Sequence, residues 1–340
     1  MKIGILTSGG DCPGINATIR GVGKTAINHY GMEVIGIHNG FSGILKKDVS
    51  TLTERSLSGI LNLGGTILGT AREKSFRKLI NSPKKEDRNK IIDAYNELEL
   101  DCLVCIGGNG TQRTTWLLSE LGLNVIGLPK TIDNDIYGTD ITFGFDTAVG
   151  IATEAIDRLH STASSHRRVM VIELMGHHAG WITLNSGMAG GADIILLPEL
   201  GYNMKVIIDK INERLEMGKP YSIVAVAEGV EIHGSTMRPA SFFAHHIQKE
   251  TGIETRETVL GYVQRGGTPS PFDRTLGTEL GGHATQLIHE GKFGRMVSVK
   301  GRGISDVPLS EVAGKLRLVT PDNNLVVQGK RIGISFGTRD

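Results

Sequence analysis

The chain has 340 residues, with 37 Lys plus Arg against 36 Asp plus Glu and a net charge of +1. This balance lacks the basic footprint that binding to nucleic acid or an anionic membrane requires, and the chain contains no apolar run of the roughly 20 residues that span a bilayer. The length exceeds that of most single cores and predicts two lobes with a cleft between them. Because Met1 to Gly10 lead straight into strand-like sequence, we expect a cytoplasmic protein.

Short β-branched and apolar runs, each followed by a glycine-bearing turn, recur along the chain. In chain order they are KIGILTSGG (2–10), MEVIGIHNG (32–40), DCLVCIGGNG (101–110), NVIGLPKT (124–131), RVMVIELMG (168–176), DIILLPE (193–199), YSIVAVAEG (221–229) and TVLGYVQRGG (258–267). Most show no polar alternation, which is typical of strands that are covered on both faces.

Stretches with a period near 3.6 residues lie between these runs and predict helices. They cover residues 90–98, 112–121, 148–160, 204–217, 240–251 and 272–289. Strand followed by helix, repeated, predicts an α/β fold of two lobes, each a mainly parallel sheet with helices on both faces. A strand-like segment at 258–263 suggests that the chain crosses back, so we expect lobes of 1–144 plus about 264–312 and of 145–263 plus about 313–340.

Two glycine-rich turns follow predicted strands, where ligands of parallel sheets bind. TSGGDCPGIN (7–16) joins a strand to a helix whose start is marked by Pro13, and IGGNGTQ (106–112) has the same construction. Bare backbone and free N–H groups at a helix start favour an anion. The first segment alone fits a plain turn equally well, but two such turns favour a nucleotide or polyphosphate site.

The segment PKTIDND (129–135) carries two carboxylates beside a lysine. If residues 131–135 are extended, Asp133 and Asp135 project to the same side about 7 Å apart. That spacing suits one carboxylate accepting a proton from an attacking hydroxyl while the other holds Mg²⁺ on a phosphate. Asp-Asn-Asp is also common in turns, which is the alternative for the segment in isolation.

Several other motifs fail their structural requirements. GKT at 23–25 lacks the earlier glycine of a P-loop, and no G-x-G-x-x-G follows the first strand, which disfavours a dinucleotide-binding oxidoreductase. Cys102 and Cys105 lie on opposite faces of an apolar strand, so we expect buried thiols rather than a metal site. His177 and His178 have no third ligand at zinc spacing.

Seven segments, in order and across nearly the whole chain, resemble the 6-phosphofructokinase family. They are TSGGDCPGIN, GGTILGTAR, GGNGT, PKTIDND, AIDRLHSTASSHRR, MGHHAG and LGYVQRGG. The resemblance implies phosphoryl transfer from ATP to the C1 hydroxyl of fructose 6-phosphate in glycolysis, with Mg²⁺ as cofactor. It also implies a homotetramer, or a homodimer as the alternative, in which sugar sites borrow arginines from a neighbouring subunit.

The resemblance assigns roles to individual positions. It implies that Asp133 is the general base, with Thr131 and Arg72 as further catalytic residues and Asp135, with a weak contribution from Asn109, at the metal. The donor-binding residues that it implies are Gly9, Arg72, Gly108, Asn109, Gly110, Thr111 and Lys130. The substrate-binding residues that it implies are Thr131, Asp133, Arg168, Met175, Gly176, His177, Glu228, Arg256 and Arg265.

This chain departs from the family pattern at several positions. Asn109 stands where ATP-using members have an aspartate, His177 where many have arginine, and Tyr262 where many have histidine. Lys130 is typical of pyrophosphate-using members, but Gly110 replaces the aspartate that blocks ATP in them. Gly110 leaves space for the α-phosphate of ATP, and this space is a stricter requirement for the donor than the extra positive charge of Lys130. We therefore expect ATP as donor.

Two alternative functions remain open from the sequence. One is a pyrophosphate-dependent phosphofructokinase, and the other is a non-catalytic sugar-phosphate sensor that kept the fold after Asn109 replaced a metal ligand. The effector site of bacterial members is only partly matched, since His160 and Tyr221 replace usual residues there. We therefore expect weak or absent control by ADP or phosphoenolpyruvate.

Overall fold

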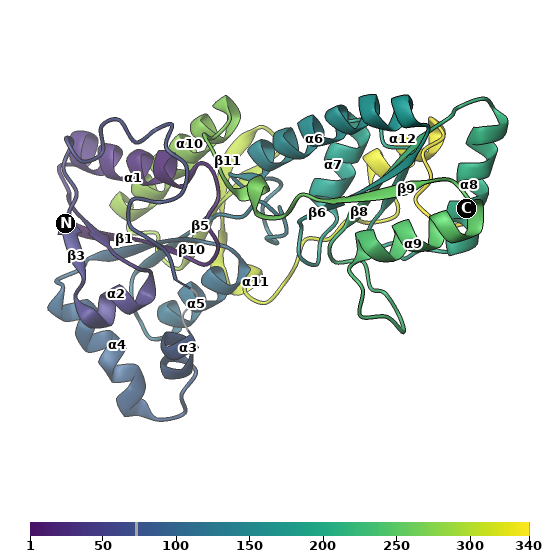
Figure 1. The fold of residues 1–340 in the computed structure, drawn as a ribbon. Coiled ribbons are helices and arrows are strands. Elements are labelled where there is room, and N and C mark those ends of the chain that lie inside the picture. The colour runs from purple at the N-terminus through teal and green to yellow at the C-terminus, as the bar shows by residue number, and fades with distance from the viewer. Residues whose placement is uncertain (72–73, 340) are drawn as a thin grey trace. The chain divides into compact units, whose positions relative to one another are not determined.

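The computed structural model describes residues 1–71 and 74–339, which form two compact units (Figure 1). The first unit consists of Met1–Thr131, Ile136–Asp146 and Arg265–Leu316. The second consists of Ile132–Asp135, Thr147–Gln264 and Arg317–Asp340. Each contains a mainly parallel sheet with helices on both faces, so the predicted fold class is confirmed.

The sheet of the first unit has seven strands. Their order is β11 (Gly303–Pro308), β10 (Arg295–Lys300), β5 (Val125–Pro129), β4 (Cys102–Gly107), β1 (Lys2–Ser8), β2 (Glu33–Ile37) and β3 (Val49–Thr51). The five inner strands are parallel, and β11 and β3 pair antiparallel at the two edges. The turns after β1, β4 and β5 therefore meet at one edge of the sheet.

Helices cover both faces of this sheet (Figure 1). One face carries α1 (Ile15–Tyr30) and α10 (Pro271–His289). The other carries α2 (Phe41–Lys46), α3 (Lys74–Ile80), α4 (Lys85–Glu97) and α5 (Asn109–Glu120), and the short α11 (Leu309–Val312) follows β11. The apolar sides of α2 to α5 form one buried cluster with β2 and β4, which fixes α3 and α5 beside the turns.

The sheet of the second unit has four parallel strands. Their order is β7 (Ile194–Leu196), β8 (Ser222–Ala227), β6 (Val169–Leu174) and β9 (Thr255–Val259). One face packs against α8 (Met204–Glu216) and α9 (Pro239–Thr251). The other face carries α6 (Phe145–His166), α7 (Trp181–Ala189) and α12 (Asn324–Arg331) (Figure 1).

The prediction of a strand over 258–263 is wrong in its bounds. The strand β9 ends at Val259, and Gly261–Arg265 form a 3₁₀ helix that begins with Gly261 at φ 56°. A left-handed backbone interrupts a strand, and the apolar letters there continue into a turn. The true strand, TRETV, is polar and partly exposed because β9 is an edge strand, so its sequence lacks the apolar signal.

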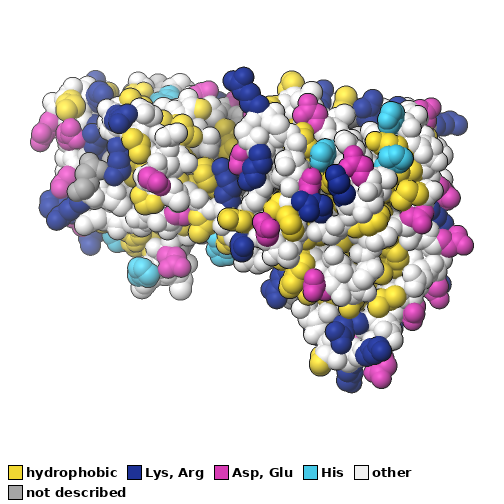
Figure 2. Space-filling model, turned by 180° about the vertical axis from the view of Figure 1, so that it is seen from behind, with side chains coloured by type: hydrophobic (Ala, Val, Ile, Leu, Met, Phe, Trp, Pro, Cys, Tyr) yellow, Lys and Arg dark blue, Asp and Glu magenta, His cyan; other side chains and the backbone are white. Residues whose placement is uncertain are grey.

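No helix among the described residues is both long and apolar enough to cross a membrane. Basic and acidic side chains are interspersed over the face seen in Figure 2, in keeping with the net charge of +1. The three cysteines, Cys12, Cys102 and Cys105, all lie in the described part of the chain and are buried free thiols. Burial raises the pKa of Cys105 to about 12, so this thiol stays protonated and inert at neutral pH.

Candidate active site

The turn after β1 leaves its backbone open on one side. Gly9 has φ 87°, a left-handed conformation that favours glycine, and its N–H donates to the carbonyl of Ala71 at 3.3 Å. A Cβ atom on Gly10 would lie 1.8 Å from Nη1 of Arg265. The absence of a side chain at Gly10 therefore lets the Arg265 guanidinium lie directly on the turn.

The turn after β4 lies beside the first turn. Gly108 precedes α5, and the hydroxyl of the buried Thr111 donates to the carbonyl of Ser8 at 3.4 Å. The buried Lys130, which follows β5, donates from Nζ to the carbonyl of Gly10. Three neighbouring strand ends thus bring together two glycine turns, a helix N-terminus and an ammonium, which is an arrangement suited to a polyphosphate.

The charge of this region acts on Cys12, the second residue of the DCPG turn. Burial raises the pKa of the Cys12 thiol, although the nearby Lys130 and Arg265 favour its ionised form. Cys12 is therefore a neutral buried thiol in a region that Lys130 and Arg265 make electropositive.

Residues that the sequence did not reveal line a small cavity at the same turns. Arg77, on α3, lies so close to Gly110 that a Cβ there would meet Nη2 at 2.3 Å. Phe41 and Phe76 stack with ring centroids 5.0 Å apart and line the cavity together with Gly9. The helix α3 has only seven residues, so no amphipathic period could have indicated it.

The segment after β5 differs from the extended conformation that we expected. Asn134 has φ 52°, so Asp133 and Asp135 do not follow simple strand alternation. Both carboxylates are 9% exposed. Arg317 fixes the turn, since its N–H donates to the carbonyl of Asp135 at 2.8 Å and Nη1 to that of Asn134 at 3.2 Å.

Arg317 is a second residue that sequence reasoning missed. Its guanidinium carbon lies 4.0 Å from the centre of the Trp181 ring, and the Trp181 indole N–H donates to the Arg317 carbonyl at 2.9 Å. This cation–π contact joins the start of α7 to the aspartate turn within the second unit. Trp181 and Arg317 are 136 positions apart in the sequence, so no local sequence pattern could have indicated their contact.

The MGHHAG segment after β6 and the residue after β8 form one structure. One oxygen of Glu228, Oε1, accepts hydrogen bonds from the N–H groups of Gly176 at 3.3 Å and His177 at 2.9 Å. Gly176 has φ 149°, and a Cβ there would lie 2.4 Å from the Ala179 carbonyl. The structure therefore brings together Met175, Gly176, His177 and Glu228, as a common site requires.

A cavity of about 240 Å³ opens at the carboxyl ends of β6, β8 and β9. Met175 and Glu228, two of the predicted sugar contacts, line it together with Glu173, Arg238 and Tyr262. A pocket at this edge of a parallel sheet is where ligands of such folds bind. The second unit thus has a site of its own, distinct in residues from the glycine turns of the first unit.

Arg168 and Arg256, also predicted to contact the sugar phosphate, lie elsewhere in the second unit. Nε of Arg168 donates to Glu254 at 2.7 Å, and Arg256 forms an ion pair with the other oxygen of the same carboxylate. The hydrogen bond from Arg168 lowers the pKa of Glu254. These arginines lie toward the amino ends of β6 and β9, whereas the cavity lies at the carboxyl ends. At about 3.3 Å per residue, Arg168 is roughly 17 Å from Glu173 along β6, and Arg256 is about 10 Å from Val259 along β9.

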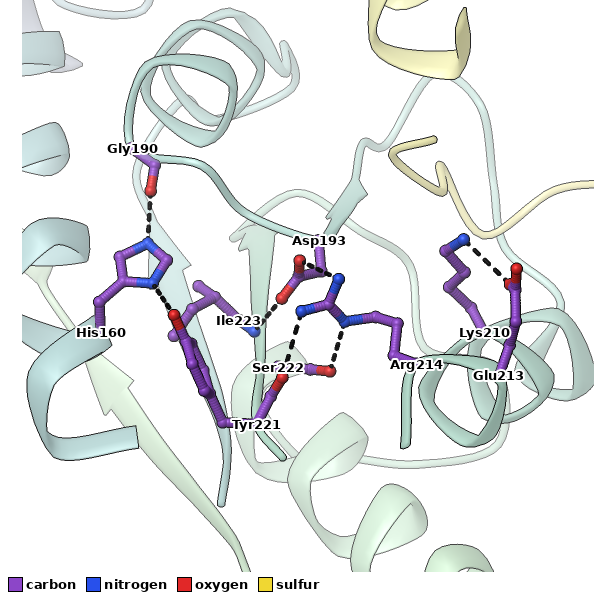
Figure 3. Close-up of polar contacts among 9 residues, drawn as sticks. All are labelled: His160, Gly190, Asp193, Lys210, Glu213, Arg214, Tyr221, Ser222 and Ile223. Carbon is purple, nitrogen blue, oxygen red and sulfur yellow. Dashed lines mark hydrogen bonds and ion pairs between the residues drawn. The ribbon is translucent and has the colours of Figure 1, made fainter. Parts of the chain in front are cut away.

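His160 and Tyr221, at the positions of the expected effector site, are engaged with each other (Figure 3). The two side chains are 3.2 Å apart, and the other His160 nitrogen contacts the Gly190 carbonyl at 2.6 Å. Beside them, Arg214 binds Asp193 at 2.7 Å, although burial still raises the pKa of that carboxyl. These internal contacts favour weak effector binding, and the absence of control by ADP or phosphoenolpyruvate stays a prediction.

Two further predictions concern the catalytic role of Arg72 and the binding of a metal ion. Arg72 lies outside the described residues, so its role stays a prediction. Among residues 1–71 and 74–339, no group of three or more His, Cys, Asp or Glu side chains could hold a metal ion by itself.

Together these features define an α/β protein with two sheet-based units, one with glycine turns at its strand ends and one with a polar pocket. A phosphofructokinase family model matches residues 2–288. The chain belongs to the phosphofructokinase family, and the predicted resemblance is confirmed.

Individual relatives agree with this family. The chain is 65% identical to a Bacteroides thetaiotaomicron protein named ATP-dependent 6-phosphofructokinase 3, over 99% of this chain and 100% of the relative. It is 52% identical to an ATP-dependent 6-phosphofructokinase of Spirochaeta thermophila, over 98% and 97%. The solved phosphofructokinase of Saccharomyces cerevisiae superimposes with a TM-score of 0.81 at 32% identity, over 92% of this chain and 45% of the yeast chain.

Proposed function

We propose that this protein transfers the γ-phosphoryl group of ATP to the C1 hydroxyl of fructose 6-phosphate and so forms fructose 1,6-bisphosphate in glycolysis. The observation that carries the proposal is the convergence of two glycine turns with Lys130 and Arg265 at one edge of a parallel sheet. The second unit adds a polar cavity lined by Met175 and Glu228. The names of both curated relatives support the activity.

ATP is the donor that the cavity at Gly110 supports. Gly110 has no side chain, so the start of α5 offers bare backbone beside Arg77. An aspartate at this position would bring a carboxylate toward the phosphates of ATP, and a glycine leaves room for this donor. Lys130 is the one feature that favours the pyrophosphate-dependent alternative, and its bond to the Gly10 carbonyl gives it a role in holding the turn.

In the proposed reaction, Asp133 accepts the proton of the C1 hydroxyl as this oxygen attacks the terminal phosphorus. A carboxylate acts as a general base once the attacking hydroxyl is held within hydrogen-bond reach. Thr131 contacts the sugar or the transferred group. Arg72 stabilises the negative charge that spreads over the moving phosphoryl oxygens.

The oxygen donors of this chain fit Mg²⁺ bound mainly through the phosphates of the substrate. Mg²⁺ is usually held by one or two carboxylates plus substrate oxygens, and Asp135 offers such a carboxylate. The amide oxygen of Asn109 is a weaker ligand at the start of α5. Mg²⁺ would supply neutralisation of the phosphate charge.

The assembly that we propose is a cytoplasmic homotetramer, with a homodimer as the alternative. Its support is the separation of Arg168 and Arg256 from the cavity along β6 and β9. Both guanidinium groups bind Glu254 near the amino ends of these strands, away from the cavity of their own chain. We infer that they serve the cavity of a second copy.

The proposed function predicts the outcome of one set of assays with the purified protein. Formation of fructose 1,6-bisphosphate is followed with ATP and, separately, with pyrophosphate, each with and without Mg²⁺. We expect turnover with ATP and Mg²⁺, little turnover with pyrophosphate and none after chelation of the metal. Turnover with pyrophosphate alone would identify the other donor, and binding of sugar phosphate without turnover would identify a sensor.

A further inference from the structure

The cavity of the second unit holds a cation that the family pattern did not indicate. Arg238 lines it together with Glu228 and Tyr262. Neither the ion pairs nor the hydrogen bonds of the described residues engage the Arg238 guanidinium. The arginine therefore carries a positive charge that is available to a ligand in the cavity.

The backbone beneath Arg238 is anchored, so the position of this arginine is defined. Arg238 precedes Pro239, the first residue of α9, and its φ and ψ of −66° and 152° are those that a following proline imposes. The carboxylate of the buried Glu173, on β6, accepts a hydrogen bond from the Ala240 N–H at 3.0 Å. Through this bond the strand that forms the cavity floor also fixes the residue that supplies its cation.

The acidic side chains of the cavity would disfavour an anionic ligand unless a cation were also present. Two carboxylates, Glu173 and Glu228, line it, and a phosphate ester beside them would be repelled. The sequence supplies His177 and Tyr262 at two positions where many family members have arginine and histidine. A guanidinium at Arg238 restores the lost charge and can bind a phosphate through two parallel N–H groups.

We propose that Arg238 binds the phosphate group of the sugar substrate and makes the site select phosphorylated over unphosphorylated sugar. The inference rests on the proposed function, because it takes the cavity as the sugar-phosphate site. Arg238 belongs to the same chain as the cavity, unlike the arginines that we expect from a second copy. It is thus a specificity residue that each subunit supplies to itself.

Calorimetric titration of fructose 6-phosphate without ATP tests the inference separately from turnover. In Arg238→Ala we expect the Kd to rise roughly tenfold to a hundredfold, because a charge-assisted contact is lost. Arg238→Lys should recover part of this loss, since lysine keeps the charge but not the planar fork. Met237→Ala, a change at the adjacent exposed residue, should leave the Kd unchanged.

The kinetic assay adds a second readout. Arg238→Ala should raise the KM for fructose 6-phosphate, while kcat and the KM for ATP stay within about twofold. A Kd for fructose 6-phosphate that is unchanged in an Arg238→Ala protein with the wild-type melting temperature would overturn the inference. Absence of turnover in the wild-type enzyme would instead refute the proposed function and leave the calorimetric result to decide on Arg238.

Discussion

Replacement of Asp133 by asparagine is expected to lower kcat by about 10²-fold to 10⁴-fold, the usual contribution of a positioned general base. The amide keeps the size of the side chain but cannot accept the proton of the C1 hydroxyl. The KM values for ATP and fructose 6-phosphate should change little, because the lost interaction acts in the transition state. Steady-state kinetics with a coupled assay of fructose 1,6-bisphosphate measures both parameters.

Two matched variants separate loss of the base from other effects. Asp322→Asn removes an exposed carboxylate elsewhere in the second unit and should leave kcat unchanged. Asp135→Asn should shift the Mg²⁺ concentration needed for half-maximal activity, an effect that Asp133→Asn should lack. Full activity of Asp133→Asn would remove Asp133 from the mechanism.

Replacement of Gly110 by aspartate is expected to raise the KM for ATP at least about tenfold, since like charges brought together cost several kcal/mol. A Cβ at this position meets the guanidinium of Arg77, with Nη2 at 2.3 Å, which is the end of a flexible side chain, so the fold should tolerate the change. The new carboxylate would then face the phosphates of ATP. Kinetics with ATP and pyrophosphate in parallel measures the effect on each donor.

Gly110→Ala is the control for this substitution. It displaces Arg77 to a similar extent but adds no charge, so its KM for ATP should lie between those of wild type and Gly110→Asp. If ATP use is unchanged in Gly110→Asp, the argument from steric room is wrong and Lys130 becomes the better guide to the donor.

The fold was predictable where burial is uniform along an element. The inner strands β1, β4, β6 and β8 are buried along nearly their whole length, so their sequences are continuous apolar runs. Edge strands such as β9 and the three-residue β3 expose residues and have no such run. Their limits depend on tertiary pairing, which local sequence does not encode.

The candidate site was predictable where glycines follow strands. The turns at Gly9 and Gly108 could be found because each glycine cluster lies directly between a strand and a helix. Arg77, Arg238 and Arg317 could not be found in this way. Each comes from a short helix, a helix cap or a distant loop, and reaches the site only through the fold.

The structure of the enzyme with fructose 6-phosphate, Mg²⁺ and a non-hydrolysable ATP analogue would decide whether a carboxylate collects the proton in this reaction. We expect a carboxylate oxygen of Asp133 to lie about 2.6 to 3.2 Å from the C1 hydroxyl oxygen, with that oxygen in line with the terminal phosphorus. A C1 oxygen beyond hydrogen-bond reach of Asp133, directly or through one water, would contradict the proposed mechanism.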